Sequence, residues 1–415
     1  FLAAMTYGAF PVPLLHEFKS SNIHHLVNHS EAKILFVDEV IWEGLSESEM
    51  PDLHAIIQVN NFKILYANDE SIIEAKAHLN ELFGRKYPEA FTEDCISYYE
   101  DTPEELAVIN YTSGTSGFSK GVMIPYRAVR SNMEFAKVVL PQMNNTSRVV
   151  SMLPSAHMYG LMFEVLYELS CGCHVFFLSR LPSPKIIMQA LAEVKPTLVI
   201  AVPLIIEKIY KSKVKPVIEN AGIKFALKLP ILEQVIMNKI KTELTNAFGG
   251  EFYEVIIGGA AFNKEVEAFF KRMEFPFTVG YGMTECAPII TYDDYKTAKL
   301  FSCGKIVPNM EMMVDSPDPQ NIPGELLVRG ANVFLGYYKN EEATREVLDA
   351  DGWLHTGDMG IIDADGYLFL RGRSKCMILG PSGQNIYPEE VEAVLDTRPY
   401  VLESLVIEDN GGLTA

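Results

Sequence analysis

Short apolar segments of strand length alternate with helix-like segments over most of this sequence. The helix-like segments include Pro184–Val194 and Lys264–Met273. Strands that alternate with helices predict an α/β fold, in which largely parallel sheets are covered on both faces. The apolar segments, rich in β-branched residues, are predicted strands. They are Lys33–Asp38, Ala55–Val59, Leu106–Asn110, Val149–Leu153, His174–Leu178, Thr197–Val202 and Tyr253–Ile257.

The pattern changes after about Leu300. Strand-like segments around Glu325–Arg329 and Tyr367–Arg371 are separated by Gly, Pro and Asp turns, with no long helix between them. This predicts a smaller β-barrel or sheet over about residues 300–373. Further along, Pro388 is followed by acidic residues, which is typical of a helix start. We therefore expect the segment beyond Lys375 to open a further domain that these 415 residues do not complete.

Composition and charge narrow the class of protein. Hydrophobic residues make up 48% of the chain and charged residues 21%, as in ordinary globular proteins. The net charge of −19 argues against a nucleic-acid binder, which needs clustered Lys and Arg to neutralise phosphates. A small nucleotide is still compatible with an acidic protein, because a local cluster of donors can hold its phosphates.

The six cysteines do not form the pattern of a disulfide framework in a chain of this length. Cys171 and Cys173 stand beside His174, as in some metal sites, but the segment continues into an apolar run and no second ligand pair has zinc spacing. We therefore interpret these cysteines as buried thiols and expect a cytoplasmic setting.

The most informative segment is Tyr111–Gly121 (YTSGTSGFSKG), which follows a predicted strand and precedes a helix-like run from Ala128. Its glycines let backbone N–H groups face a polyphosphate, while its hydroxyl side chains and Lys120 add donors and charge. It is not a Walker loop, because Lys120 stands three residues beyond Gly117. Composition alone leaves a phosphate site and a plain flexible loop equally open.

Five motifs, taken in order, resemble the signature of the adenylate-forming superfamily, which includes acyl-CoA synthetases, peptide-synthetase adenylation domains and luciferases. The motifs are Thr112–Gly121, Gly258–Ala261, Gly280–Glu285, Trp353–Asp358 and Leu370–Lys375. The resemblance covers essentially the whole chain. It implies a large domain over residues 1–373, made of two αβ-layered subdomains plus a distorted β-barrel. It also implies a hinge and an incomplete small α+β domain over residues 374–415, with the small domain rotating about the hinge.

The resemblance also implies a role for individual residues. Asp358 would hold the ribose hydroxyls, and Tyr281 would stack on adenine. Thr284 would contact the α-phosphate, and Glu285 would hold Mg²⁺, which suits a hard oxygen ligand. Lys375 would lie at the hinge; the acid that usually follows it in the family is replaced here by Cys376. The residues assigned to ATP are Thr112, Ser113, Gly114, Thr115, Ser116, Gly117, Lys120, Gly259, Ala260, Tyr281, Gly282, Asp358 and Arg373.

The substrate is expected to be a simple carboxylic acid. Leu153–Gly160 resembles the segment in which acyl- and aryl-CoA synthetases place a histidine, here His157, beside the acid. Pro203–Tyr210 and Ala247–Phe252 resemble long-chain fatty-acid–CoA ligases in particular. An acyl tunnel would then select chain length by apolar burial. Its expected lining is the His157 segment together with Ala260, Ala261, Met283 and Ala287.

The resemblance implies an AMP-forming acid–thiol ligase that uses ATP, Mg²⁺ and coenzyme A. An acyl-AMP ligase that feeds a carrier protein, and a nucleotide-binding module without turnover, stay open as alternatives. Peripheral membrane contact and a homodimer also stay open. The family pattern further leads us to expect that an opening stretch and most of the small domain, with its late catalytic lysine, lie outside these 415 residues.

Overall fold

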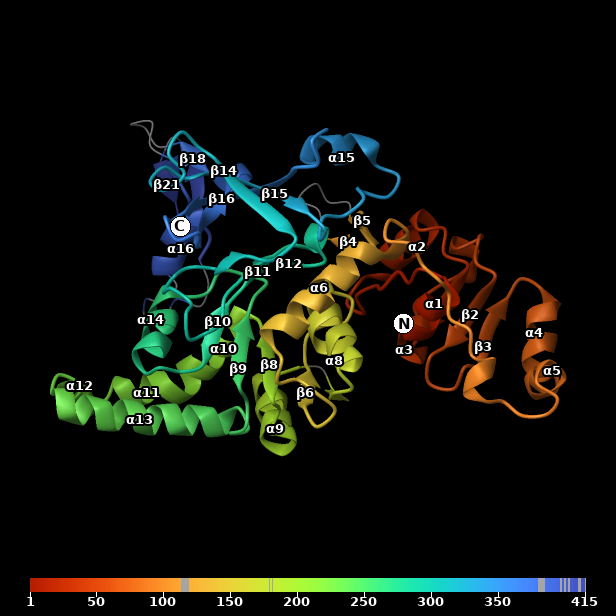
Figure 1. Cartoon of the computed structure of the whole chain (residues 1–415), viewed down its shortest axis with the longest axis horizontal. Coiled ribbons are helices and arrows are strands. Elements are labelled where there is room, and N and C mark those ends of the chain that lie inside the picture. Colours follow the sequence, from red (N-terminus) through yellow and green to blue (C-terminus); the bar gives the residue numbers. More distant parts are fainter. Residues whose placement is uncertain are drawn as a thin grey trace. The chain divides into compact units, whose positions relative to one another are not determined.

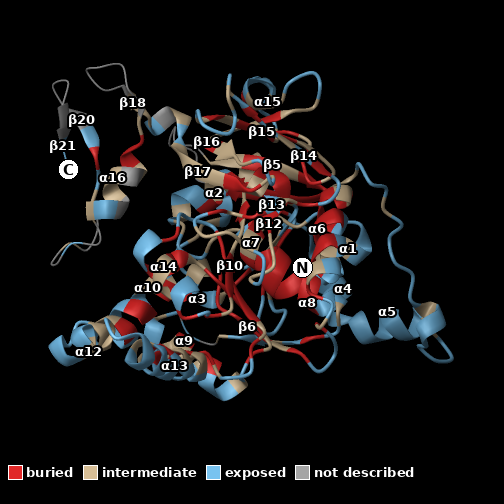
Figure 2. Cartoon of the chain, turned by 60° about the vertical axis from the view of Figure 1, so that its left-hand side comes forward, coloured by how far each residue is buried: buried red, intermediate tan, exposed pale blue. Residues whose placement is uncertain are grey.

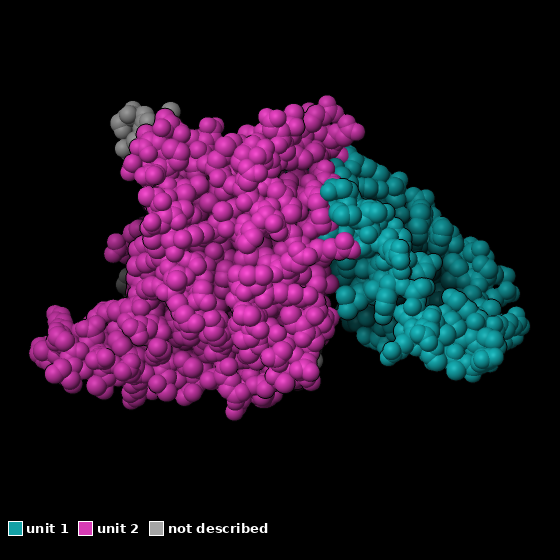
Figure 3. All heavy atoms as spheres, in the orientation of Figure 1, with its two compact units in different colours: residues 1–126, 337–339 teal, residues 127–336, 340–415 magenta. Residues whose placement is uncertain are grey.

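The computed structural model describes residues 1–112, 119–178, 180, 182–379, 385–395, 398, 401, 404–409 and 412–414. The chain forms two compact units (Figure 3). Unit 1 contains residues 1–126 and 337–339, and unit 2 contains residues 127–336 and 340–415.

Unit 1 begins with a small mixed sheet packed against helix α2 (Ser20–His29). In this sheet β1 (Ile34–Val37) pairs parallel with β2 (Ala55–Gln58), and β2 pairs antiparallel with β3 (Ile64–Ala67). The side chains of its core are buried because they come from the apolar faces of the helix and strands. The other helices and short turns of this unit are α1 (Leu2–Tyr7), α3 (Glu39–Trp42), η1 (Glu47–Glu49), α4 (Glu70–Ala77), α5 (Leu79–Lys86) and η2 (Glu93–Cys95).

The predicted phosphate loop lies between two antiparallel strands. β4 (Leu106–Thr112) pairs with β5 (Lys120–Pro125), and Thr112 lies opposite Lys120 at the end of the ladder. A connection this short can join antiparallel strands, whereas a parallel crossover needs a dozen or more residues. The sequence prediction missed β5, so the loop leads into a strand and not directly toward the helix, α6 (Tyr126–Val139).

Unit 2 is built on a parallel sheet in the order β10–β9–β8, with bounds Phe277–Val279, Glu254–Ile257 and Leu198–Ala201. Every residue of β8 and β9 is buried, as continuous apolar strands covered on both faces should be. Helices pack against this sheet and form one hydrophobic core with it. Figure 1 shows these helices around the strands. The helices are α9 (Pro184–Val194), α10 (Pro203–Ile209), α13 (Pro230–Ala247) and α14 (Lys264–Arg272).

Helix α9 begins and ends where the sequence predicts. Ser183 accepts a hydrogen bond from the backbone N–H of Ile186, and Pro184 occupies the first helical position. A parallel pair, β6 (Arg148–Ser151) and β7 (His174–Phe177), lies earlier in the chain. The connecting segments are α7 (Met158–Leu161), η3 (Met162–Leu166), α8 (Tyr167–Ser170), η4 (Tyr210–Val214), α11 (Lys215–Ile218) and α12 (Ala221–Ala226).

The β-region predicted after Leu300 is a four-stranded antiparallel sheet in the order β14–β15–β16–β17. Its strands are Met310–Asp315, Gly324–Gly330, Leu354–Ile362 and Leu368–Arg373; whether they close into a barrel stays a prediction. A second antiparallel group contains β11 (Tyr281–Gly282), β12 (Ile289–Tyr292) and β13 (Lys305–Ile306). The remaining elements are η5 (Thr284–Cys286), α15 (Glu341–Val347), η6 (Ser374–Cys376), β18 (Ile378–Leu379), β19 (Asn385–Ile386), α16 (Pro388–Leu395), β20 (Ile407–Asp409) and β21 (Gly412–Thr414).

Helix α16 begins at Pro388, as predicted. The boundary predicted between residues 373 and 374 stays a prediction. The described helices include none that is both long enough and apolar enough to span a membrane.

Several carboxyl groups lie inside unit 2, where Figure 2 colours the central strands as buried. Glu254 on β9 is fully buried and accepts a hydrogen bond from the Tyr292 hydroxyl at 2.9 Å. Burial raises the pKa of Glu254 to about 8, although the Tyr292 hydrogen bond lowers it. Burial also raises the pKa of Glu164 to about 8 and that of Glu267 to about 7. The folded chain therefore holds protons that the unfolded chain releases near pH 4.5.

We expect the free energy of unfolding to fall as the pH rises from 5 to 8. A carboxyl whose folded pKa is raised stabilises the fold fully below its unfolded pKa, and this contribution is lost as the pH rises through the folded pKa. Each such group adds a slope of up to about 1.4 kcal/mol per pH unit. Glu254→Gln should flatten the decline, measured by urea denaturation at each pH. Glu243→Gln, at an exposed position of α13, is the control; equal slopes in wild type and Glu254→Gln would contradict the assignment.

Candidate functional site

A partly buried hydrogen bond joins two of the residues that the sequence assigns to nucleotide binding. The Tyr281 hydroxyl on β11 donates to Oδ2 of Asp358 on β16 at 2.5 Å. Tyr281 is 8% exposed, and the two residues are 77 positions apart in sequence. The fold of unit 2 therefore brings together two motifs that were linked only by their order along the chain.

Arg373 lies beside the Tyr281–Asp358 pair because of the way in which β16 and β17 are paired. Asp358 on β16 lies directly opposite Arg373 on β17. The Nε atom of Arg373 lies 3.3 Å from Oδ1 of Asp358, and the arginine side chain is 66% exposed while the aspartate is 13% exposed. Solvent screens a pair with so exposed a partner, so the pair orients the carboxylate more than it stabilises the fold.

Desolvation dominates the electrostatics of Asp358. Burial raises the pKa of Asp358, and the charges of Glu389 and Glu325 add to this, while the Tyr281 hydrogen bond and Arg373 lower the pKa. Burial, followed by the charge of Asp358, also holds the pKa of Tyr281 far above its ordinary value, so its hydroxyl stays a donor. A carboxylate has about four lone-pair sites, so Asp358 keeps capacity to accept from the hydroxyls of a ligand.

The turn that carries Thr284 and Glu285 is fixed from both sides by Asn132 of α6. The Asn132 amide donates to the Cys286 carbonyl at 3.2 Å and accepts from the Ile289 N–H at 3.0 Å. Asn132 is fully buried, Glu285 is 8% exposed and Thr284 is half-buried. The carbonyl of Glu285 also accepts from the backbone N–H of Phe334 at 2.9 Å.

Two glycines of the motifs meet steric requirements. A Cβ atom at Gly282 would lie 2.1 Å from the carbonyl oxygen of Pro288, so no larger residue fits there. Gly259, two residues after the end of β9, has a φ of +88°, which L side chains rarely adopt. Ala260, the next predicted residue, is exposed.

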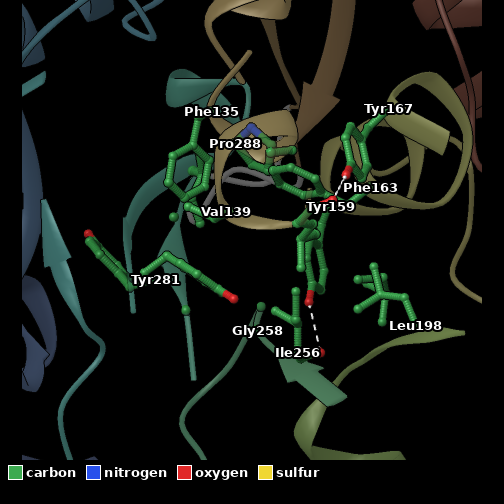
Figure 4. Close-up of a pocket in the computed structure, with 18 of the residues that line it drawn as sticks. Phe135, Val139, Tyr159, Phe163, Tyr167, Leu198, Ile256, Gly258, Tyr281 and Pro288 are labelled. Carbon is green, nitrogen blue, oxygen red and sulfur yellow. Dashed lines mark hydrogen bonds between the residues drawn. The ribbon is translucent and has the colours of Figure 1, made fainter. Parts of the chain in front are cut away.

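An apolar pocket adjoins this cluster (Figure 4). Tyr281 forms part of its wall, and Tyr159 contributes from the segment of the predicted histidine, with its hydroxyl donating to the Ile256 carbonyl at 3.2 Å. Most of the remaining lining comes from one face of α6, from η3 and α8, and from β8 and β9. The residues around the pocket are Phe135, Ala136, Val139, Leu140, Tyr159, Phe163, Tyr167, Glu168, Leu198, Ile200, Ile256, Gly258, Gly259, Gly280, Tyr281, Gly282, Pro288, Ile289 and Tyr292.

This lining differs from the tunnel expected from sequence. Ala260, Ala261, Met283 and Ala287 do not line the pocket. Ala260 and Ala261 are exposed, and Ala287 is buried. His157 is exposed just before α7 and is not among the lining residues either.

The predicted phosphate loop belongs to unit 1. The Lys120 ammonium lies over the Tyr337 ring, 4.6 Å from its centroid. Thr112 and Lys120 are the described ends of the loop. Ser113, Gly114, Thr115, Ser116 and Gly117 lie outside the described residues.

Two further predictions concern the end of the large domain and metal binding. Lys375 lies in the short turn η6, and its side chain is outside the described part.

All six cysteines are free thiols; Cys173 is buried, and Cys171 is half-buried. Across the described stretches, no three His, Cys, Asp or Glu side chains gather as a metal cluster would require.

Sequence reasoning missed Asn132, which fixes the turn, and the α6 side chains that line the pocket. The spacing Phe135, Ala136, Val139, Leu140 is the i, i+1, i+4, i+5 pattern of one apolar helix face. That pattern could have marked a buried face. It could not have told which neighbour the face covers.

A family model, curated relatives and solved structures all match this chain over most of its length. A family model described as "AMP-binding enzyme" matches residues 1–338. Long-chain-fatty-acid–CoA ligase ACSBG2 of Homo sapiens is 28% identical over 98% of this chain, and the match covers 64% of that protein. Long chain acyl-CoA synthetase 6, peroxisomal, of Arabidopsis thaliana is 29% identical over 98% of this chain, and the match covers 60% of that protein. The chain thus spans less than two thirds of the length of these curated relatives.

Solved structures share the fold. MatB of Rhodopseudomonas palustris with bound ATP has a TM-score of 0.74 at 22% identity, covering 98% of this chain and 72% of that one. O-succinylbenzoate coenzyme A synthetase of Bacillus subtilis, in complex with ATP and magnesium, has a TM-score of 0.72 at 23% identity, covering 99% and 74%. Likeness at this identity establishes the fold of the chain.

Asn132→Ala should destabilise unit 2 by about 2–4 kcal/mol. The change leaves the buried Ile289 N–H and Cys286 carbonyl without their partner, and each unsatisfied buried group costs about 1–3 kcal/mol. Chemical denaturation of the variant measures the effect. Asn238→Ala, at an exposed position of helix α13, is the matched control and should change stability by under about 1 kcal/mol. Equal stability of both variants would show that the Asn132 contacts do not hold the turn.

Proposed function

Because the chain belongs to the AMP-binding enzyme family, we propose that it activates a carboxylic acid with ATP. In the first step a carboxylate oxygen attacks the α-phosphorus of ATP, and pyrophosphate leaves, which gives an acyl-adenylate. In the second step the thiolate sulfur of coenzyme A attacks the acyl carbon and AMP leaves. The product is an acyl-CoA thioester.

The observation that carries this proposal is the pair Tyr281–Asp358 at the wall of an apolar pocket. A desolvated carboxylate with spare acceptor capacity suits a pair of sugar hydroxyls, and an adjacent apolar pocket suits an acyl chain. The two halves of an acyl-adenylate would therefore meet at Tyr281.

Asp358 would accept hydrogen bonds from both ribose hydroxyls, with Arg373 contributing from the next strand. Tyr281 already holds Oδ2 of Asp358, so the carboxylate is oriented before the nucleotide binds. Fixing the sugar in this way favours in-line attack at the α-phosphorus, because positioning supplies much of the rate of such reactions. Tyr281 and the backbone around Gly259, Ala260 and Gly282 would face the adenine ring.

The acidic turn suits magnesium. Mg²⁺ usually takes one or two protein carboxylates and completes its shell with substrate phosphates and water. Glu285 supplies one carboxylate and Thr284 one hydroxyl on a turn that Asn132 fixes. When bound, the ion would offset negative charge on the phosphate oxygens.

Three other predicted roles remain part of the proposal. The Thr112–Lys120 loop would hold the leaving pyrophosphate with its N–H groups and the Lys120 charge. His157 would lie near the acid. Lys375 would take part in the hinge between the large and small domains.

We propose long-chain fatty acids as the substrate class. Its walls are almost wholly apolar, and burial of an alkyl chain contributes about 0.8 kcal/mol per CH₂. Two relatives named for long-chain acids point the same way.

Asp358→Ala should weaken ATP binding by about 10- to 100-fold. A hydrogen bond to a charged group contributes about 1.5–3 kcal/mol, and 1.4 kcal/mol corresponds to a factor of ten in affinity. Asp358→Asn keeps one acceptor oxygen and should lose less. Calorimetric titration measures the affinities, and Asp315→Ala, at an exposed position of the same sheet, is the control. A folded Asp358→Ala variant with wild-type affinity would remove Asp358 from the site.

Acid-dependent AMP release tests the function itself. In an assay across acid lengths, kcat/KM should rise from short to long fatty acids, amino acids should be ignored, and thioester should form only with coenzyme A. Turnover to acyl-AMP that ignores coenzyme A would favour transfer to a carrier protein. A preference for acetate or for an amino acid would overturn the long-chain assignment.

A variant of the pocket tests whether the pocket determines the dependence of kcat/KM on acid length. Val139 lines the pocket, so Val139→Trp should lower kcat/KM for the longest acids by about tenfold or more while sparing short ones. Val138, next to it, is 72% exposed, so Val138→Trp is the matched control. An equal loss at all chain lengths would mean that the acyl chain does not occupy this pocket.

A further inference from the structure

One acidic side chain in the pocket has no role in the mechanism above. Glu168 on α8 lines the pocket and is 0% exposed. Neither of its carboxyl oxygens has a hydrogen-bond partner. A buried polar group without a partner is destabilising, so this side chain calls for an explanation.

The other polar side chains of the same lining are paired. Each tyrosine hydroxyl among the described lining residues donates to a protein acceptor, which leaves Glu168 as the one lining side chain with unpaired polar atoms. The pairs are Tyr159 with the Ile256 carbonyl at 3.2 Å, Tyr167 with the Leu140 carbonyl at 3.1 Å, Tyr281 with Asp358 at 2.5 Å and Tyr292 with Glu254 at 2.9 Å.

Glu164, one helical turn earlier, has a carboxyl group that is hydrogen-bonded within the fold. Its oxygens accept from the backbone N–H groups of Met152 and Leu153 at 2.9–3.2 Å and from the Ser151 hydroxyl at 3.3 Å. Glu164 therefore holds the end of β6 and is absent from the pocket lining. Glu168 makes no such contact, so holding the fold does not account for it.

We infer that Glu168 is a specificity-determining residue that binds a hydroxyl group carried on the acyl chain of the substrate. This inference rests on the proposed function, because it names the class of acid that the pocket takes. Tyr167, the neighbour of Glu168, and Tyr281 lie on different sides of the pocket in Figure 4. The recognised hydroxyl would thus lie along the chain, away from the carboxyl group that reacts beside the nucleotide.

A neutral hydroxyl fits this position better than a charged group. Burial, followed by the charge of Glu164, holds the pKa of Glu168 well above its ordinary value, although its own backbone N–H lowers it. A protonated carboxyl both donates and accepts, as does a hydroxyl. An ammonium group would require a buried ion pair, and a second carboxylate would bring a further charge into an apolar wall; both carry a large desolvation cost.

A plain alkyl chain would leave the Glu168 oxygens unpaired, whereas a hydroxylated chain would pair them. Sites built to hydrogen-bond a substrate group reject analogues that lack it, because the polar group of the site is left unsatisfied. For one neutral hydrogen bond we expect discrimination of about 3- to 30-fold.

The test compares hexadecanoic acid with hydroxyhexadecanoic acids that carry the hydroxyl at successive positions. Calorimetry measures their binding to the full chain, and AMP release measures their turnover. The wild-type chain should prefer at least one hydroxy acid over the plain acid. Glu168→Leu should abolish or reverse this preference, and Glu168→Gln should retain part of it. Glu164→Gln, which removes a carboxyl from the same helical segment outside the pocket, should lower stability but keep the preference.

The two readouts separate failure of the inference from failure of the proposed function. A preference in binding that depends on Glu168, without AMP release for any acid, would support the inference and sink the catalytic proposal. AMP release with the same hydroxy-to-plain ratio in wild type and Glu168→Leu would overturn the inference and leave the function standing. No binding of any hydroxy acid to the wild-type chain would also overturn it. Thermal melting of each variant identifies loss of fold, and Glu168→Gln, which keeps the shape of the side chain, then decides the question.

Discussion

The hydrogen bond from Tyr281 to Asp358 is the constraint on which the site of unit 2 depends. Tyr281 lies on β11 of one antiparallel group, and Asp358 lies on β16 of another antiparallel sheet, so one contact joins two separate sheets. The contact is important because the carboxyl group of Asp358 is largely removed from water. A carboxylate deprived of water needs the donors that are close to it, and Tyr281 and Arg373 are two such donors in the described part of the chain.

The strands and the order of the motifs could be predicted from sequence because both are local properties. The run that becomes β8 is continuously apolar, and β9 departs from this only at Glu254; such runs identify strands covered on both faces. Helix α9 could be placed to the residue because Ser183 and Pro184 are strong start signals. β5 was missed because its strand pattern begins inside the glycine-rich motif, where Lys120 and Gly121 suggested a loop.

The walls of the pocket could not be predicted, because they depend on which face of a helix meets which sheet. Val139 and Asn132 lie on the same helix, and one lines the pocket while the other holds a turn more than 150 residues away in sequence. The motifs drew attention to Ala260 and Met283, which lie within them. Tertiary packing places other motif residues in the lining and completes it with side chains of α6, η3 and α8, whose sequences carry no motif.

Desolvation raises the pKa of both Asp358 and Glu168, but their surroundings differ. Asp358 lies beside a donor and a cation, which offset part of the effect of burial, so it suits a polar ligand at the edge of the pocket. Glu168 is buried without either, so it favours the protonated form and suits a neutral partner within the pocket. In the proposed function, one apolar wall would thus separate a site for charge and hydroxyls beside the nucleotide from a site for an uncharged group along the acyl chain. The pairing of each carboxyl, more than its burial, determines which chemistry it can recognise.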